Sequence, residues 1–88
     1  MRLESAPNPF VSATELGWET PARTVRLCIY DPAGRLVRSR AWRTTTGERG
    51  RFTWDGTDAA GRRVAAGTYY CELRAGDQVT ATRVVLLH

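Results

Sequence analysis

The sequence of 88 residues contains no lysine, a single histidine and no long apolar run. Without lysine, the Lys–Asn and Lys–Asp isopeptide cross-links of some extracellular β-domains cannot form. No apolar stretch approaches the roughly 20 residues that a membrane-spanning helix needs, so we expect no membrane insertion. The first ten residues also lack the apolar stretch of a signal peptide. We therefore expect any export signal to lie upstream of this fragment.

Groups for catalysis are scarce. The only histidine, His88, is the last residue, and chain ends are usually frayed. Neither cysteine has a base that is visible in the sequence, and no carboxylate pair sits in a context that would separate two pKa values. No phosphate loop, zinc-ligand spacing or dinucleotide fingerprint occurs. The sequence predicts a protein that is not an enzyme and needs no cofactor.

Arginine supplies all of the positive side-chain charge. Thirteen arginines against nine acidic residues give a net charge of +4. A nucleic-acid binder is expected to gather such charge on one face, whereas these arginines are scattered along the sequence and interleaved with acids. We expect a solvated surface of mixed sign and no nucleic-acid partner.

Apolar and polar residues alternate along most of the chain, and no segment has a helical period. The predicted strands are 13–19, 23–31, 35–43, 51–54, 67–75 and 78–87, with at most a short edge segment at 63–65. Residues 31–34 predict a type I turn, residues 44–50 a loop, and residues 76–77 a hairpin connection. Short strands separated by turns at this spacing predict an all-β, antiparallel β-sandwich.

The parity of the strands predicts which side chains face the interior. Trp54 ends a strand, where a large ring suits a plug between two sheets. Tyr69 begins the strand after Gly67, with its ring inward. The predicted core consists of Val25, Leu27, Ile29, Val37, Trp54, Tyr69, Cys71 and Leu73.

Residues 51–73 place two aspartates on a glycine-rich segment. Calcium takes about six to eight oxygen ligands, and Asp55 and Asp58 with flanking carbonyls supply too few unless Asp31 or Glu48 lies nearby. Asp58 can instead accept local backbone N–H bonds in an Asx-type turn. We interpret both aspartates as turn residues, and calcium binding stays open as the alternative.

These motifs carry a family resemblance. They are Asn8-Pro9-Phe10, Tyr30-Asp31, Gly34-Arg35-Leu36-Val37, Trp54-Asp55-Gly56, Asp58, Gly61, Val64, Gly67, Tyr69, Leu73, Ala75-Gly76 and Val85-Leu86-Leu87. In combination they make the chain similar to the FlgD-type immunoglobulin-like domain and to the type A C-terminal sorting domain of type IX secretion cargo. The resemblance covers Pro7 to the end. It implies an immunoglobulin-like (fibronectin III-like) sandwich of about seven strands, without catalytic activity.

The resemblance also implies a function and a place in a longer protein. We expect residues 8–88 to form the domain, and residues 1–7 to be a linker or residues added by cloning. In such domains, which end larger secreted or surface proteins, the export machinery reads the last strand and its closing residues. The recognition candidates there are Val85, Leu86 and Leu87. The expected partners are the secretion machinery or the preceding domain of the parent protein.

Two other functions stay open. The first is a self-assembling scaffold, as in the flagellar hook cap, since exposed strand edges can pair between subunits. We expect such pairing near residues 63–65. The second is carbohydrate binding by Trp42, whose parity with Arg38 and Arg40 predicts an exposed ring. Burial of this ring against the neighbouring sheet is the alternative.

The two cysteines could form the inter-sheet disulfide of immunoglobulin domains, because the sandwich places their strands near each other in opposite sheets. Cys71 shares the inward parity of Tyr69 and Leu73, whereas Cys28 points away from the side of Leu27. A disulfide needs Cβ atoms about 3.5–4.5 Å apart. We therefore expect free thiols, and oxidation after export remains the alternative.

Overall fold

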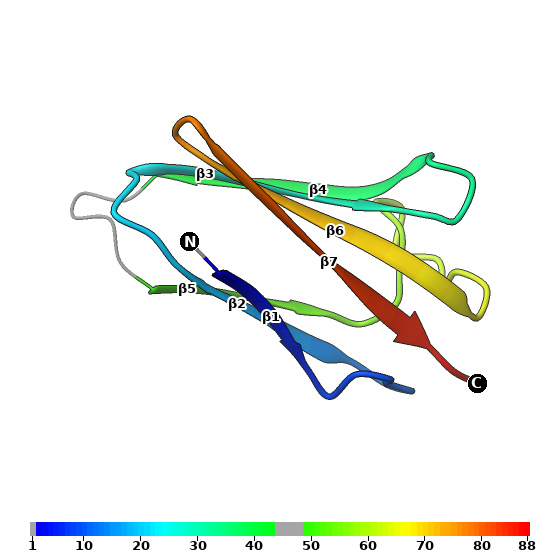
Figure 1. Ribbon diagram of the computed structural model, residues 1–88. Coiled ribbons are helices and arrows are strands. Elements are labelled where there is room, and N and C mark those ends of the chain that lie inside the picture. Colours follow the sequence, from blue (N-terminus) through cyan, green and yellow to red (C-terminus); the bar gives the residue numbers. More distant parts are fainter. Residues whose placement is uncertain (1, 44–48) are drawn as a thin grey trace.

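The computed structural model describes residues 2–43 and 49–88, which form seven strands in two layers (Figure 1). The strands are β1 (Arg2–Ala6), β2 (Thr14–Glu19), β3 (Thr24–Tyr30), β4 (Leu36–Arg43), β5 (Arg49–Trp54), β6 (Gly67–Ala75) and β7 (Gln78–Leu86). One sheet has the order β1-β2-β5 and the other the order β4-β3-β6-β7, with every pair antiparallel. The predicted all-β sandwich is confirmed. The described residues contain no helix that could cross a membrane.

The core lies between the two sheets and is built from alternate residues of their strands, as the period of two requires. Its central ring is Trp54, which is fully buried and lies 5.5 Å from the Phe10 ring and 5.2 Å from the Tyr69 ring, centroid to centroid. The indole N–H is satisfied by the carbonyl of Thr57 at 2.8 Å. Val37 lies at the margin of the core and is only partly buried.

β1 is the main departure from the sequence prediction, which treated residues 1–7 as a linker. Arg2–Ala6 pairs with β2 along its whole length, with Leu3 opposite Trp18. Leu3 is buried in the core. A five-residue segment with one large apolar side chain has too little alternation to be read as a strand, so its partner strand decides its conformation. The sandwich therefore begins before residue 8.

Three further expectations need correction or fall outside the described residues. Of the loop predicted at 44–50, residues 44–48 lie outside the described part, and residues 49 and 50 belong to β5. The edge segment predicted at 63–65 is not a strand, since Arg63 makes only an isolated bridge to Thr57. Strand pairing at that place therefore loses its structural basis.

The cysteines lie on neighbouring strands of the same sheet rather than in opposite sheets. β3 pairs with β6 in a register that places Cys71 opposite Ile29 and Cys28 opposite Glu72. Consecutive residues of a strand point to opposite faces, so the two side chains lie on opposite faces of the sheet. Both thiols are free and buried.

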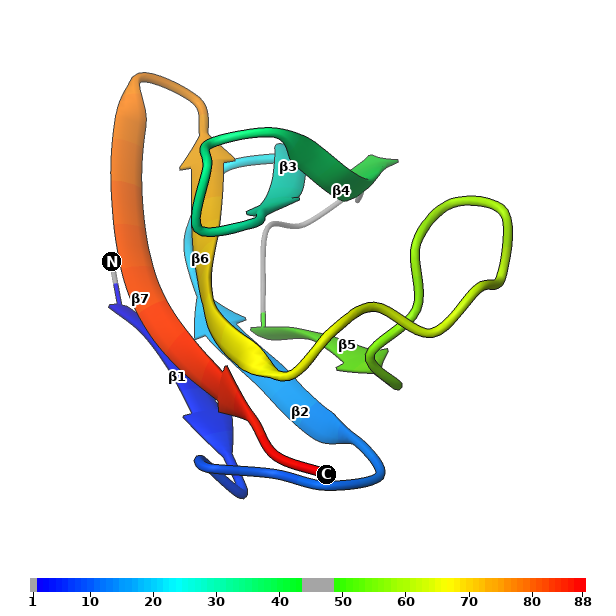
Figure 2. The same cartoon turned by 90° about the vertical axis from the view of Figure 1, so that its right-hand side faces the viewer.

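The two layers leave two seams, which Figure 2 shows on opposite sides of the molecule. At the closed seam, β1 packs against β7, and Phe10 forms a parallel bridge to Leu86. At the open seam, β4 and β5 are the last strands of their sheets and do not pair with each other. The seams differ in the residues that line them, and the candidate sites follow this difference.

Candidate functional site

The turn at Asp58 explains one of the two metal candidates. Oδ1 of Asp58 accepts hydrogen bonds from the backbone N–H groups of Ala60 (2.9 Å) and Arg62 (3.0 Å), and Oδ2 accepts one from Arg62 Nε (3.2 Å). The backbone bond from Arg62 is the main cause that lowers the pKa of this carboxyl. Gly61 has a φ of 80°, which the turn requires and which glycine adopts readily.

The same turn occurs earlier in the chain, at Asp31. Its Oδ1 accepts bonds from the N–H groups of Ala33 and Arg35, both at 2.9 Å, and its Oδ2 accepts one from Arg35 Nε at 3.0 Å. Gly34 takes the left-handed position with a φ of 84°. The shared sequence is Asp-x-Ala-Gly-Arg. This short repeat is a sequence signal that Asp31 and Asp58 each cap a turn.

Asp55, the other metal candidate, belongs to a side-chain network. The hydroxyl of Thr57 donates to Asp55, and this bond is the main cause that lowers the pKa of the Asp55 carboxyl. Arg38 Nη1 donates to the Thr57 hydroxyl at 3.1 Å and lies 3.7 Å from Asp55 Oδ1. Among residues 2–43 and 49–88, no three acidic, cysteine or histidine side chains gather as a metal site would require. Glu48 lies outside those residues.

The C-terminal recognition candidates differ in accessibility. Leu86 is buried in the core at 1% exposure, so its side chain is not accessible to a partner. Val85 is partly buried, and Leu87 is 45% exposed. Of the three, Leu87 is the most exposed side chain.

The edge of β7 is covered by the segment 8–10, which the sequence analysis had treated only as a motif. The Phe10 N–H donates to the Val85 carbonyl at 2.9 Å, and the Leu87 N–H donates to the Phe10 carbonyl at 2.8 Å. The Asn8 amide extends this pairing with its side chain. Its nitrogen donates to the Arg83 carbonyl (2.8 Å), and its oxygen accepts from the Val85 N–H (3.0 Å). Asn8 thus pairs with β7 as a strand backbone does.

At the open seam, arginine and aromatic side chains lie together. Register places Arg38 opposite Ile29 and Arg40 opposite Leu27, so both arginines share the inner face of the sheet with core residues. The Arg38 guanidinium lies 5.5 Å from the Phe52 ring centroid, and that of Arg40 lies 6.0 Å from it. Cations over aromatic faces at such distances are stabilising. The aliphatic and aromatic parts of this layer are thereby shielded where the two sheets separate.

Trp42 is partly buried in the same layer rather than fully exposed, which corrects the first expectation for this residue. Its ring centroid lies 5.1 Å from that of Trp18 and 5.9 Å from that of Phe52, and the Arg40 guanidinium lies 5.5 Å from it. A sugar that stacks on tryptophan needs a free ring face. With these three neighbours packed around it, Trp42 is a poor platform for a carbohydrate.

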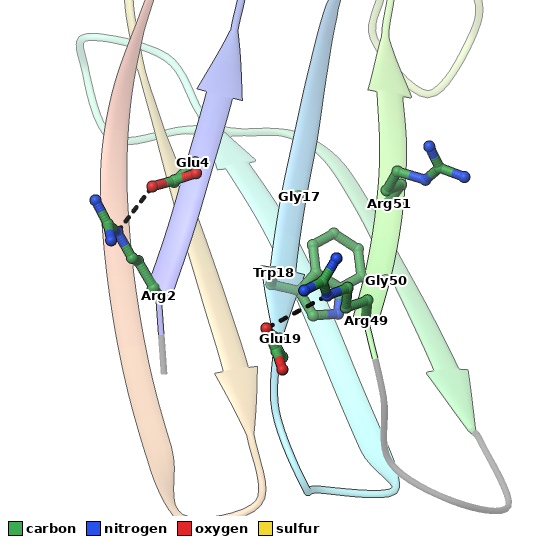
Figure 3. Close-up of a pocket in the computed structure, with 8 residues that line it drawn as sticks. All are labelled: Arg2, Glu4, Gly17, Trp18, Glu19, Arg49, Gly50 and Arg51. Carbon is green, nitrogen blue, oxygen red and sulfur yellow. Dashed lines mark ion pairs between the residues drawn. The ribbon is translucent and has the colours of Figure 1, made fainter.

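A shallow hollow of about 690 Å³ lies on the three-stranded sheet around Gly17 (Figure 3). It exists because Gly17 has no side chain and nothing else fills the space above it. Four charged residues of its rim pair with each other, Arg2 with Glu4 at 2.7 Å and Arg49 with Glu19 at 3.4 Å, and Arg51 lies 3.9 Å from Glu15. These pairs leave the hollow with little net charge to hold an ionic ligand.

The side chains of Cys71 and His88, which could take part in catalysis, are held within the fold. Burial raises the pKa of the Cys71 thiol to about 12, which keeps the thiol protonated and unreactive at neutral pH. His88 accepts a hydrogen bond at Nε2 from the Ala66 N–H at 3.1 Å, so the last residue is tied to the loop before β6. The frayed end expected from sequence is thus hydrogen-bonded into the fold.

Known proteins share this architecture. The family model described as the FlgD Ig-like domain matches residues 8–78. No curated protein sequence matches the chain.

Three solved structures are similar to the chain. Dimeric latent PorU from Porphyromonas gingivalis has a TM-score of 0.71 and 25% identity, over 97% of this chain and 9% of PorU. FlgD from Xanthomonas campestris has a TM-score of 0.65 and 24% identity, over 97% of this chain and 62% of that protein. FlgD from P. aeruginosa has a TM-score of 0.63 and 22% identity, over 84% and 59%. This chain spans less than two thirds of each protein, and its immunoglobulin-like fold agrees with the prediction.

Proposed function

Because the chain belongs to the FlgD Ig-like domain family, we propose that it is a non-catalytic β-sandwich module of a larger secreted or surface protein. The observation that carries this proposal is that the polar groups of the family motifs form hydrogen bonds within the fold. Asp31 and Asp58 cap turns, Asp55 bonds to a threonine and the Trp54 indole N–H bonds to a carbonyl. These bonds give the motif residues structural roles, which supports a non-catalytic module.

Within that role, secretion sorting or attachment is the first candidate. The similar domain occupies only 9% of PorU, as expected for a module appended to other domains. Recognition by an export machinery requires accessible side chains, and Leu87 at 45% exposure supplies one at the end of β7. The partners proposed are the secretion machinery and the preceding domain of the parent protein, in an extracytoplasmic location.

A reporter fused upstream of the whole chain and given a signal peptide tests sorting. We expect the reporter outside the cells of a bacterium that has a type IX secretion system and inside the periplasm when that system is deleted. Leu87→Asp should reduce export, whereas Val79→Asp, at a 54% exposed apolar position of β7, should not. A reporter that stays in the periplasm of both strains contradicts the sorting function.

Scaffold assembly is the second candidate, supported by the likeness to FlgD, whose structure is connected with hook capping and flagellar assembly. Self-association would use the edge of β5, the last strand of its sheet at the open seam, rather than residues 63–65. Light scattering after size-exclusion chromatography over a wide concentration range tests it. A monomer at every concentration contradicts assembly and leaves the sorting function untouched.

A further inference from the structure

The free edge of β4 presents backbone groups to solvent in a defined pattern. The Thr24 carbonyl accepts a bond from Gly76, on the β6 side of β3. Thr24 therefore does not bond to its partner Arg43, and the N–H and C=O of Arg43 face away from β3. At the other end of β4, the Val37 carbonyl accepts a bond from the N–H of Ala59 in the 55–66 loop at 3.2 Å. Both ends of β4 therefore indicate that the backbone groups of odd-numbered residues point away from β3.

The alternation places the outward backbone groups at residues 37, 39, 41 and 43. The 55–66 loop covers the first of these. Ser39, Ala41 and Arg43 are exposed, and within the described residues no strand pairs with this edge. A short stretch of edge is thus left with donors and acceptors that match those of an extended chain.

The chemistry around this edge is strongly basic. β4 and β5 carry five arginines and no acidic residue, and these arginines are Arg38, Arg40, Arg43, Arg49 and Arg51. Three of them have acidic partners from other elements, at 3.7 Å for Arg38, 3.4 Å for Arg49 and 3.9 Å for Arg51. Arg40 and Arg43 make no ion pair with another described residue, so their charges attract negative groups to the β4 edge.

A second copy of this chain is a poor partner for the edge. Pairing two β4 edges about a two-fold axis would bring the arginines of one copy against those of the other, and like charges on facing strands are destabilising. Charged edges commonly prevent such pairing. The same arginines favour a strand that carries carboxylates.

We propose that the β4 edge at Ser39–Arg43 binds an extended, acidic polypeptide segment as an added strand. The segment exchanges backbone hydrogen bonds with Ser39, Ala41 and Arg43, which gives affinity. Its alternate side chains lie on one face, and carboxylates on that face lie beside Arg40. Nucleic acid is the weaker candidate, because it satisfies the charge but cannot use the row of backbone donors and acceptors.

Hydrogen exchange and titration of the whole chain by NMR test the proposal. The probe is a short peptide, capped at both ends, in which glutamate alternates with valine. Its binding should slow exchange of the outward Ser39, Ala41 and Arg43 amides and leave that of Arg40, whose N–H faces β3, unchanged. The same peptide with lysine in place of glutamate should not bind.

Variants separate strand addition from simple charge attraction. Ala41→Pro removes the outward N–H at an edge position where proline is tolerated, and should weaken binding roughly tenfold, which is about 1.4 kcal/mol. Its control, Ala41→Val, keeps the N–H and should bind like the unaltered chain. Arg40→Glu should also weaken binding roughly tenfold, whereas Arg83→Glu, on the distant strand β7, should change it less than about twofold.

Three results would overturn the proposal. One is equal binding by Ala41→Pro and Ala41→Val, which would mean that no strand is added. Another is protection of the Ala41 amide without peptide in a concentration-dependent dimer, which would identify a second copy as the occupant. The third is no change at the outward amides when peptide binds. Because exchange is measured on the unaltered chain, this last test stands even if Ala41→Pro fails to fold.

Discussion

At the closed seam, residues 8–10 hydrogen-bond to β7 and place the Phe10 ring against Trp54, whereas at the open seam no pairing joins β4 to β5 and arginines lie over the rings. Both seams solve one problem, which is to keep water from the ends of the aromatic core. At the closed seam, residues 8–10 form hydrogen bonds with the backbone of the edge strand β7. The open seam uses cations and leaves an edge strand available.

The closed seam contributes more to the stability of the fold, and the open seam is the one that can bind another chain. Apolar burial and backbone bonds are lost together when the closed seam opens, and each is costly. Guanidinium groups over rings contribute less, because such contacts are worth about 0.5–2 kcal/mol. Substitutions at the closed seam should therefore lower stability most, and substitutions at the open seam should change binding more than stability.

The largest effect is expected from Phe10→Ala. Phe10 is 2% exposed, and truncation of a buried phenylalanine costs about 3–5 kcal/mol in free energy of unfolding. Urea denaturation followed by tryptophan fluorescence measures it. Val11→Ala, at a neighbouring position with 53% exposure, should stay within about 0.5 kcal/mol of the unaltered chain. Similar losses for both variants would show that Phe10 is not the plug of this seam.

Alanine substitutions at two glycines near the open seam should change stability differently. A Cβ at Gly50 would collide with the Trp18 indole, so Gly50→Ala should cost about 1–3 kcal/mol through displacement of the aromatic layer. A Cβ at Gly17 would meet no atom within 4 Å. Gly17→Ala should therefore be neutral or stabilise by up to about 1 kcal/mol, since it restricts the unfolded chain. Thermal unfolding of both variants checks the pair, and equal destabilisation would contradict the packing of Trp18 on Gly50.

The Asn8 amide should contribute less than the Phe10 ring. Asn8→Ala removes two hydrogen bonds to β7, at 2.8 and 3.0 Å. A net value of about 0.5–1.5 kcal/mol per bond predicts a loss of about 1–3 kcal/mol. The local signature is faster hydrogen exchange of the Val85 amide. Ser12→Ala, at an exposed position of the same connection, serves as the control. If the Val85 amide keeps its protection in Asn8→Ala, the side chain does not act as a substitute strand.

Much of the fold was predictable because most strands bury one face. In β3 and β6 the alternation of apolar and polar residues follows from that burial, and both strands were predicted to within one residue of their bounds. β1 was missed because Leu3 is its only large apolar residue, and its conformation depends on β2. The local sequence has no pattern that predicts a strand of this kind.

The candidate sites were less predictable, for physical reasons that particular residues illustrate. Arg38 and Arg40 were read as outward because they are charged, yet they share the inner face where the sheets separate. Leu86 was expected to be recognised and is buried. The role of Asn8 depends on a strand more than seventy residues away, which sequence proximity cannot reveal. The turn at Asp58 was predicted from its local sequence, and its Asp-x-Ala-Gly-Arg pattern repeats that of Asp31.

The smallest effect on stability is expected at the Asp31 and Asp58 turns, which lie outside both seams. This effect depends on pH. Backbone N–H bonds from Arg35 and Arg62 lower the pKa values of Asp31 and Asp58 in the folded state. Each charged carboxylate therefore stabilises the fold above its unfolded pKa of about 3.9, and this stabilisation is lost as pH falls through the lower folded pKa.

Asp58→Asn keeps an oxygen that can accept the turn bonds and removes only the charge. Its melting temperature should lie below that of the unaltered chain near neutral pH, and the two curves should converge as the pH approaches about 2. Asp31→Asn should behave in the same way, and the double variant should show the sum of the two shifts, because the turns share no partner. A melting-temperature difference that persists in acid would assign the effect to turn geometry rather than charge.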